Sequence, residues 1–461
     1  MSIEPLPTPT PVGMAQDRPS RADPTPSGRI GWIVGGSLAT GLVAALLLVA
    51  APVIPAEKSE LEGAALCGFA LGWAMLAGLS VRFTDQPQRW AAAPALFLGL
   101  CGLLLVVFGA EVHGVLAWVW PPALLALVVW MVSRARRRLH SRTGRWLLYP
   151  VFALMAVAAI GGGIQTVAEA LDAEPRMPGQ LIDVGGHSLH LRCSGSGSPT
   201  VVLEPGAGLM SSTLGWIAPA VARETRVCVY DRAGHGWSEP ADSPQDAEQT
   251  ATDLHTLLQR GNVPGPYVLA GHSFGGLYVQ RFAAQFPDDV AGLVLVDTTG
   301  RRSEPTPAAS PDESSPDGMD RVSALLSSTA DLGVGRWLSQ GSYDSLPPQS
   351  ADEAEATGST VSNVQSTIDE YLQANTSSAQ AAALQDFGDK PLVVLTAGRG
   401  SDADKIAAHG DLAALSTNSA HRVVDGATHE SLLLDEQDAA ATTRAILDVV
   451  SSVRSGERLV R

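Results

Sequence analysis

Five long apolar segments near the amino terminus constrain the fold of this chain more than any other feature. Each is about long enough to cross a hydrocarbon layer of ~30 Å as a helix that rises 1.5 Å per residue. Almost no charged side chains interrupt them, which favours membrane spans over the alternative, buried helices of a soluble bundle. The sequence therefore predicts an all-α transmembrane region of about five helices over residues 29–170. The segments are Ile30–Val53, Leu61–Val81, Ala91–Ala110, Val115–Val132 and Trp146–Val167.

Basic residues in the connecting loops indicate how these spans are oriented. Arginines crowd the loop between the fourth and fifth segments and also occur between the second and third, whereas the first loop is net acidic. Basic loops remain on the cytoplasmic side of a membrane. We therefore expect a multi-pass protein of the cell membrane with a cytoplasmic amino terminus, and an odd number of spans puts the rest of the chain outside the cytoplasm. The residues concerned are Arg82, Arg89, Arg134, Arg136, Arg137, Arg138, Arg142 and Arg145, with Arg18, Arg21 and Arg29 in the tail.

The sequences on either side of the spans differ in composition. Residues 1–28 are rich in Pro and Thr and have no hydrophobic period, which predicts a disordered tail. Residues 177–461 carry 18 basic against 36 acidic side chains. Such an excess of negative charge repels phosphate backbones and argues against a nucleic-acid partner. The lipid bilayer is the partner that the spans predict.

A short stretch in the second part, Tyr267–Gly276, has the pattern of a nucleophile elbow. An apolar strand runs into Gly-His-Ser-Phe-Gly and then into a helical pattern, so Ser273 is expected at the tip of a sharp turn with its hydroxyl exposed. Gly271 and Gly275 stand where strand and helix approach closely and a Cβ would clash. The alternative is that Ser273 only caps the helix.

Four motifs in the second part resemble those of the α/β-hydrolase superfamily and occur in its order. They are Leu203-Glu-Pro-Gly-Ala-Gly208, Tyr230-Asp-Arg-Ala-Gly-His-Gly-Trp-Ser238, Gly271-His-Ser-Phe-Gly275 and Gly426-Ala-Thr-His429. The resemblance implies an α/β fold over residues 177–455 with a mostly parallel eight-stranded sheet. Alternating short β runs and amphipathic helices from Met177 onward agree with that fold class.

The resemblance also implies a helical cap inserted at about residues 300–388, where family members cover the nucleophile and exclude water. The first part of this insertion, Arg301 to Asp317, is rich in Ser, Pro and acidic residues and is expected to be mobile. Gly318 to Phe387 has a mostly helical pattern. Nothing in the insertion identifies a substrate.

The catalytic residues follow from the same resemblance. His429 comes after the last strand with the family's two small residues before it, and is expected to take the proton of Ser273 as a general base. Two carboxylates remain open as the residue that orients the imidazole: Asp297, at the end of the strand after the elbow helix, and Asp402, just beyond the penultimate strand. We favour Asp297, because Gly400 occupies the position at which most relatives carry the acid.

The oxyanion donors are expected to be backbone amides. One is that of Phe274, directly after the nucleophile, and the other belongs to Gly206 or Ala207, because Pro205 has no amide hydrogen. Glu204 and Pro205 stand where the family commonly has His-Gly, which leaves two interpretations of Glu204. It is either a carboxylate that supports the site or a surface residue at a strand end.

Two cysteines and two histidines have expected structural roles. Cys193 and Cys228 lie on strands that are adjacent in the resembled sheet, so an exported domain is expected to join them in a disulfide. His272 is expected to pack against a neighbouring strand turn, pointing away from Ser273, and His235 to stabilise its own turn. No Cys or His cluster has metal-ligand spacing and no phosphate loop is present, so the sequence predicts neither a metal nor a cofactor.

Together these features predict a membrane-anchored serine hydrolase that cleaves an ester of a small-molecule or lipid-like acyl group through an acyl-enzyme. A peptidase or an acyltransferase with the same catalytic residues is the alternative within the fold. A catalytically idle binding module attached to a functional membrane region is the alternative from a different class.

Overall fold

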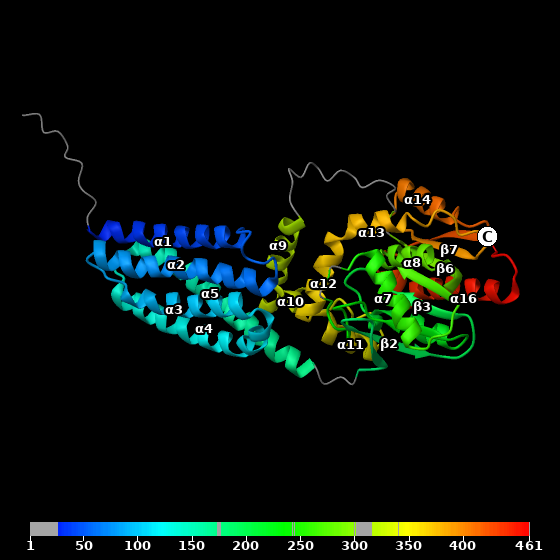
Figure 1. The fold of residues 1–461 in the computed structure, drawn as a ribbon, viewed down its shortest axis with the longest axis horizontal. Coiled ribbons are helices and arrows are strands. Elements are labelled where there is room, and N and C mark those ends of the chain that lie inside the picture. The colour runs from blue at the N-terminus through cyan, green and yellow to red at the C-terminus, as the bar shows by residue number, and fades with distance from the viewer. Residues whose placement is uncertain are drawn as a thin grey trace, which may run out of the picture.

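The computed structural model describes residues 26–172, 177–241, 243, 245–298, 300, 316–339 and 341–460. A bundle of long helices forms one end of the molecule and a sheet covered by helices forms the other, with α9 (Pro316–Ser327), α10 (Val334–Ser339) and α12 (Val361–Leu372) between them (Figure 1). Most of the predicted tail lies outside the described residues. Its last three residues, 26–28, already belong to the first helix of the bundle.

The bundle consists of five helices, as the apolar segments predicted. All five are long and apolar enough to cross a membrane, with mean hydropathies from 1.8 to 2.5. Their outward faces carry large apolar side chains such as Leu47, Leu96 and Leu154, which are 67%, 74% and 71% exposed. Such faces fit a hydrocarbon surrounding and not water. The helices are α1 (Pro26–Val49), α2 (Lys58–Phe83), α3 (Ala92–Phe108, after the 3₁₀ turn η1, Arg89–Ala91), α4 (Ala110–Arg138) and α5 (Arg142–Asp172).

The second part contains the predicted eight-stranded, mostly parallel sheet, with strand order β1-β2-β4-β3-β5-β6-β7-β8. Strand β2 is antiparallel to both of its neighbours, and every other pair is parallel. The strands are β1 (Gln180–Asp183), β2 (Ser188–Ser194), β3 (Thr200–Glu204), β4 (Val227–Tyr230), β5 (Tyr267–His272), β6 (Val290–Val296), β7 (Leu392–Ala397) and β8 (Ser419–Val424).

Both faces of this sheet are buried under helices, which explains why its central strands are continuously apolar. Successive residues of one strand enter opposite cores: Val202 packs with α7 and α8, whereas Val201 packs with α6 and α16. The covering elements are α6 (Ile217–Ala222), α7 (Ala247–Arg260), α8 (Phe274–Gln285), α14 (Ala403–Ala413), α15 (Ser431–Leu434) and α16 (Glu436–Ser455), with the 3₁₀ turns η2 (Ser211–Leu214) and η3 (Pro287–Asp289).

A helical insertion separates β6 from β7, as expected for a cap. Residues 301–315 of the segment predicted to be mobile lie outside the described residues, and its last two residues begin the first cap helix. The cap elements are α9 (Pro316–Ser327), η4 (Ala330–Leu332), α10 (Val334–Ser339), α11 (Pro348–Gly358), α12 (Val361–Leu372) and α13 (Ala374–Ala381).

The antiparallel pairing of β2 with β4 puts Cys193 directly opposite Cys228, and the two are joined in a disulfide. The other two cysteines, Cys67 and Cys101, are free thiols on membrane helices. The expected cross-strand disulfide is therefore present in the structure.

We expect two free thiols per chain when the full-length protein is unfolded without reductant, and four after reduction, because only Cys67 and Cys101 are unpaired. Ellman titration of protein purified from its native membrane measures both numbers. Four thiols before reduction would contradict the disulfide and remove the evidence that this domain matures in an oxidising compartment.

Candidate active site

Ser273 occupies the sharp turn that the sequence predicted between β5 and α8. Its backbone has φ +53° and ψ −121°, a conformation that a non-glycine residue keeps only where its surroundings enforce it. A Cβ on Gly271 would lie 2.4 Å from the carbonyl oxygen of Gly275, so strand and helix could not approach as they do. The Thr298 hydroxyl donates a hydrogen bond to the Ser273 carbonyl (2.9 Å). Ser273 stands at the helix cap but its side chain makes no capping hydrogen bond, so the capping alternative does not explain it.

Asp297 and His429 meet at the same edge of the sheet as Ser273. Asp297 directly follows β6, the neighbour of β5, and its Oδ2 accepts a hydrogen bond of 2.6 Å from Nδ1 of His429. The carboxylate is fully buried, whereas the imidazole is 37% exposed. The Ala397 amide donates to the other oxygen of Asp297 (2.9 Å). The structure therefore pairs the histidine with the acid that we favoured.

Asp402, the alternative acid, has a different position. It caps the amino end of α14, where its Oδ1 accepts from the Lys405 amide (2.8 Å). The side chain of Lys405, from the first turn of the same helix, reaches back to Asp297 Oδ2 (2.7 Å). Asp402 thus orders the helix that supplies a cation to Asp297.

The buried Asp297 remains ionised because of its donors. Burial by itself would raise the pKa of this carboxyl, but the hydrogen bonds from His429, Lys405 and the Ala397 amide hold the pKa well below its usual range. A permanently charged carboxylate on Nδ1 fixes the tautomer of His429 and directs Nε2 away from Asp297. This is the arrangement that a histidine needs in order to act as a base.

His272 connects β5 to the loop of His429. Its ring centroid lies 4.5 Å from that of His429, and its Nε2 donates to the His429 carbonyl oxygen (2.9 Å). Burial and the neighbouring His429 lower the pKa of His272 to about 3, so it stays neutral.

Within the described chain, the Ser273 hydroxyl makes no hydrogen bond, and in particular it makes none to His429. Catalytic hydrogen bonds commonly form only when substrate is bound.

The loop after β3 presents its backbone to the turn at Ser273. A Cβ on Gly206 would lie 3.1 Å from the Cβ of Ser273. Arg232 donates to the carbonyl oxygens of Pro205 (2.9 Å) and Gly206 (2.8 Å), which fixes the orientation of this loop. In the part of the chain that the structure describes, no hydrogen bond occupies the amides of Gly206 and Ala207. These amides and that of Phe274 are the expected oxyanion donors.

Two buried carboxylates share the Arg232 guanidinium. Glu204 accepts from its Nη1 (2.7 Å) and Glu370, on cap helix α12, accepts from its Nε (2.5 Å). Glu370 also accepts from the Gly208 amide (2.8 Å), and Tyr230 bonds to Glu204. Only 1% of Glu204 is exposed, so its interpretation as a surface residue was wrong. The loop after β3, which carries the expected oxyanion donors and which we call the oxyanion loop, is therefore held between the sheet and the cap.

Glu204 and Glu370, the two carboxyls that share this guanidinium, differ in pKa. Burial raises the pKa of Glu204 to about 7 against the opposing effects of Arg232 and Tyr230. Burial would also raise the pKa of Glu370, but Arg232 and His235 lower it to about 2. Glu370 is thus the permanent counter-ion, and Glu204 exchanges its proton near neutral pH.

A family model described as the alpha/beta hydrolase family matches residues 201–444, more than half of the chain. The chain belongs to the alpha/beta hydrolase family. The match runs from β3 to α16 and includes the elbow, Asp297 and His429.

Individual relatives share less of the chain. An uncharacterised protein of Schizosaccharomyces pombe is 32% identical over 161 residues, 28% of this chain and 30% of the relative. A probable transporter of Hormonema carpetanum is 32% identical over 133 residues, 27% of this chain and 19% of the relative. The chain thus spans less than a third of the length of these two proteins. A solved esterase from Thermogutta terrifontis aligns over 60% of this chain and all of its own, with 20% identity and a TM-score of 0.46.

Three residues of this hydrolase site escaped the sequence analysis. Arg232 lies inside a motif that indicated the family, but the motif gave no role for the arginine. Lys405 and Glu370 lie in helices without a motif. The one available signal was the Asp-Arg pair that follows β4 in the motif. His235, expected to be structural in its turn, also contacts the cap, because its Nδ1 donates to Asn363 (2.9 Å).

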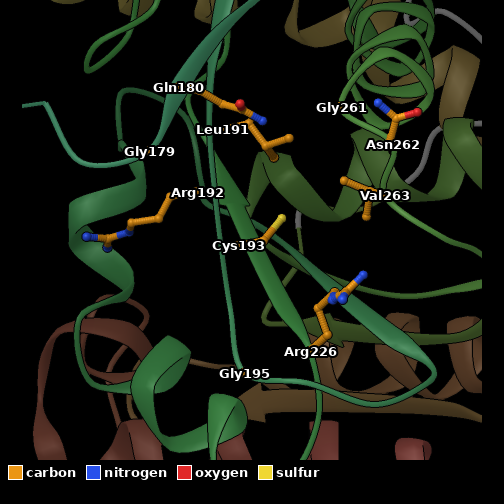
Figure 2. Close-up of a pocket in the computed structure, with 10 residues that line it drawn as sticks. All are labelled: Gly179, Gln180, Leu191, Arg192, Cys193, Gly195, Arg226, Gly261, Asn262 and Val263. Atoms are coloured by element: carbon orange, nitrogen blue, oxygen red, sulfur yellow. The ribbon is translucent and has the colours of Figure 1, made fainter.

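A surface hollow of about 510 Å³ lies elsewhere on the hydrolase domain (Figure 2). It is lined by residues around Cys193 on β2, Arg226 before β4 and the end of α7. Strand β4 starts beside the hollow and ends near Asp231. The hollow therefore lies at the opposite end of the parallel strands from Ser273. Within the described ranges, no group of three or more His, Cys, Asp or Glu side chains is arranged to hold a metal ion.

Glu204 should make the stability of the protein depend on pH. The unfolded chain releases this proton near the ordinary value of 4.5 and the folded chain only at about 7, so raising the pH through this window favours unfolding. Relative to Glu204→Gln, we expect wild type to lose roughly 2 to 3 kcal/mol between pH 5 and pH 8, at 1.36 kcal/mol per pKa unit. Unfolding of both full-length proteins in detergent, followed by tryptophan fluorescence, measures the difference. Parallel pH profiles would show that Glu204 is ionised in the folded state.

Proposed function

We propose that this protein is a membrane-anchored serine hydrolase that cleaves a carboxylic ester of a small-molecule or lipid-like substrate. The observation that carries the proposal is the buried Asp297 carboxylate on Nδ1 of His429, at the sheet edge that also holds the strained turn at Ser273. A hydroxyl after β5, a buried acid after β6 and an imidazole after β8, all at one edge of the sheet, are the parts that acyl transfer requires.

The reaction proceeds in two halves. The Ser273 oxygen attacks the ester carbonyl while His429 Nε2 takes the hydroxyl proton, and Asp297 stabilises the resulting imidazolium. The carbon–oxygen bond to the alcohol then breaks as His429 returns the proton to the leaving oxygen, which forms an acyl-enzyme. Water, deprotonated by the same histidine, then attacks the acyl group, and the bond to Ser273 breaks as His429 passes this proton to the Ser273 oxygen, which releases the acid.

The developing oxyanion is held by the amide of Phe274 and by that of Gly206 or Ala207. Losing one such donor costs roughly 3 to 4 kcal/mol of transition-state stabilisation, so the orientation of the loop after β3 matters. Arg232 supports this role because it fixes the neighbouring carbonyls while leaving the amides without partners in the described chain. The donors are backbone groups, which is why Glu204-Pro205 can replace the His-Gly common in the family.

The hydrolase domain, residues 177–455 with its cap at about 300–388, is proposed to lie outside the cytoplasm. Two observations support this location. The arginine-rich loops put one end of the bundle of residues 29–170 in the cytoplasm, and five spans then put the domain on the other side. The disulfide between Cys193 and Cys228 is typical of an oxidising compartment.

Replacing Ser273 by Ala should abolish covalent labelling by a fluorophosphonate and reduce ester turnover to background, since the attacking oxygen is gone. The measurement is gel fluorescence of the full-length protein in membranes, with wild type and Ser401→Ala as controls. Undiminished labelling of Ser273→Ala, or an unlabelled wild type, would favour an idle binding module.

The two acids should differ strongly when each is replaced by Asn. Asp297→Asn leaves the geometry intact but presents the wrong hydrogen-bonding group to Nδ1, so we expect kcat for a p-nitrophenyl ester to fall by about 10³ to 10⁴. Asp402→Asn keeps a good helix cap and should change kcat by less than about threefold. If the two variants were equally impaired, or neither were, the assignment of Asp297 would have to be abandoned.

A further inference from the structure

Cap helix α9 presents its apolar side chains outward and its hydroxyls inward. Val322, Leu325 and Leu326 are 49%, 38% and 50% exposed, whereas Ser323 and Ser327 are 6% and 0% exposed. The hydroxyl of Ser323 bonds to Asp369 on α12, and that of Ser327 bonds to the backbone of its own helix. A helix on the surface of a soluble domain has the opposite arrangement. The outward face of α9 therefore suits an apolar surrounding.

The apolar surface continues along the next two cap elements. Leu332 on η4 is 37% exposed, and Val334 and Trp337 on α10 are 40% and 71% exposed. The segment that precedes α9, residues 301–315, contains no Val, Leu, Ile, Met or aromatic residue that could cover this surface by hydrophobic packing. We call the six residues Val322, Leu325, Leu326, Leu332, Val334 and Trp337 the cap apolar face.

The first of these elements, α9, contacts the membrane helices. Ala324, on the inner side of α9, packs with Val49 of α1 and with Leu61 and Ala64 of α2. Arg321 donates to the carbonyl oxygen of Val49 (2.6 Å), at the end of α1. Figure 1 shows α9 lying across the end of the bundle. The cap apolar face, which begins on the outer side of the same helix, therefore lies beside the end of the spans.

One contact places this part of the cap beside the last turns of a membrane span. The Leu332 carbonyl oxygen would lie 2.3 Å from a Cβ on Gly161, so η4 packs directly on the backbone of α5. Gly161 is six residues inside the predicted span Trp146–Val167, which is about 9 Å at 1.5 Å per residue. Lys58, at the start of α2, forms an ion pair of 2.7 Å with Asp331 beside this contact. The headgroup layer at this end of the bundle would therefore lie at about the level of the cap apolar face.

We propose that the cap apolar face is inserted into the membrane leaflet on the hydrolase side and that the substrate is a long-chain acyl ester drawn from that leaflet. The second half of this proposal rests on the proposed function. Interfacial helices bind a leaflet in this way, with aliphatic and Trp side chains in the acyl region. Helix α12 lies between α9 and the active site, because its Asp369 bonds to Ser323 and its Tyr371 contacts Phe274 edge to face, with ring centroids 5.4 Å apart. Phe274 is the residue next to the nucleophile.

The first experiment tests insertion alone. In full-length protein with Cys67→Ala and Cys101→Ala, a bimane label is attached at Leu325→Cys and, as a matched control, at Val423→Cys. Val423 is a 41% exposed apolar residue on β8, away from the bundle. In phosphatidylcholine nanodiscs we expect lipids brominated on the acyl chain to quench the label at 325 and not at 423. Equal quenching at the two positions would overturn the insertion. That result is expected of a face in water, or of a face covered by a second copy of the chain.

The second experiment tests the substrate class. The double variant Leu325→Asp, Leu326→Asp is compared with Val423→Asp for two substrates, p-nitrophenyl acetate in solution and 4-methylumbelliferyl oleate held in the nanodisc. We expect the ratio of oleate to acetate turnover to fall about tenfold or more in the double variant only, because charged side chains leave the leaflet. An unchanged ratio would overturn a membrane-drawn substrate. If wild type hydrolysed neither ester, the proposed function would fail, and bromine quenching would still decide the insertion.

Discussion

Arg232 is buried in this hydrolase, and the site depends on how its charge is compensated. Taking a guanidinium out of water costs several kcal/mol, which only well-placed acceptors offset. Its partners are Glu204 at the end of β3, Glu370 on cap helix α12, and the carbonyls of the loop between them. One buried cation therefore joins the sheet, the oxyanion loop and the cap. The sharing of one cation between two carboxyls also explains why only Glu370 is held firmly ionised.

Two of the strand ends at the site hold a residue in a strained backbone conformation. Ser273 and Asp297 have φ of +53° and +43°, a conformation that costs of order 1–3 kcal/mol for a non-glycine residue. Neighbouring strands stabilise both positions: the Ser273 amide donates to Val296 and the Asp297 amide donates to Leu395. Parallel pairing of β5, β6 and β7 thus aligns a hydroxyl and a carboxylate at one edge.

The cap contacts both the oxyanion loop and the helices of the bundle. On one side it supplies Glu370 to the oxyanion loop, and on the other its first helix packs against α1 and α2. The Gln165 amide of α5 donates to the Ser359 carbonyl, and the Glu169 carboxylate of α5 accepts from the Val361 amide, so the start of α12 is also tied to a membrane helix. Helices α1, α2 and α5 thus contact the cap at several points.

The sequence alone determined the features whose physics is local. Hydropathy over about 20 residues suffices to predict a span, and the elbow at Ser273 is visible because its glycines stand beside it in the chain. The choice between Asp297 and Asp402 needed the tertiary structure, since it depends on which strand end faces His429. Lys405 and Glu370 were hidden for the same reason: each acts on a residue more than 100 positions away. Only the packed chain brings such charges together, because burial and partnership are properties of the whole fold.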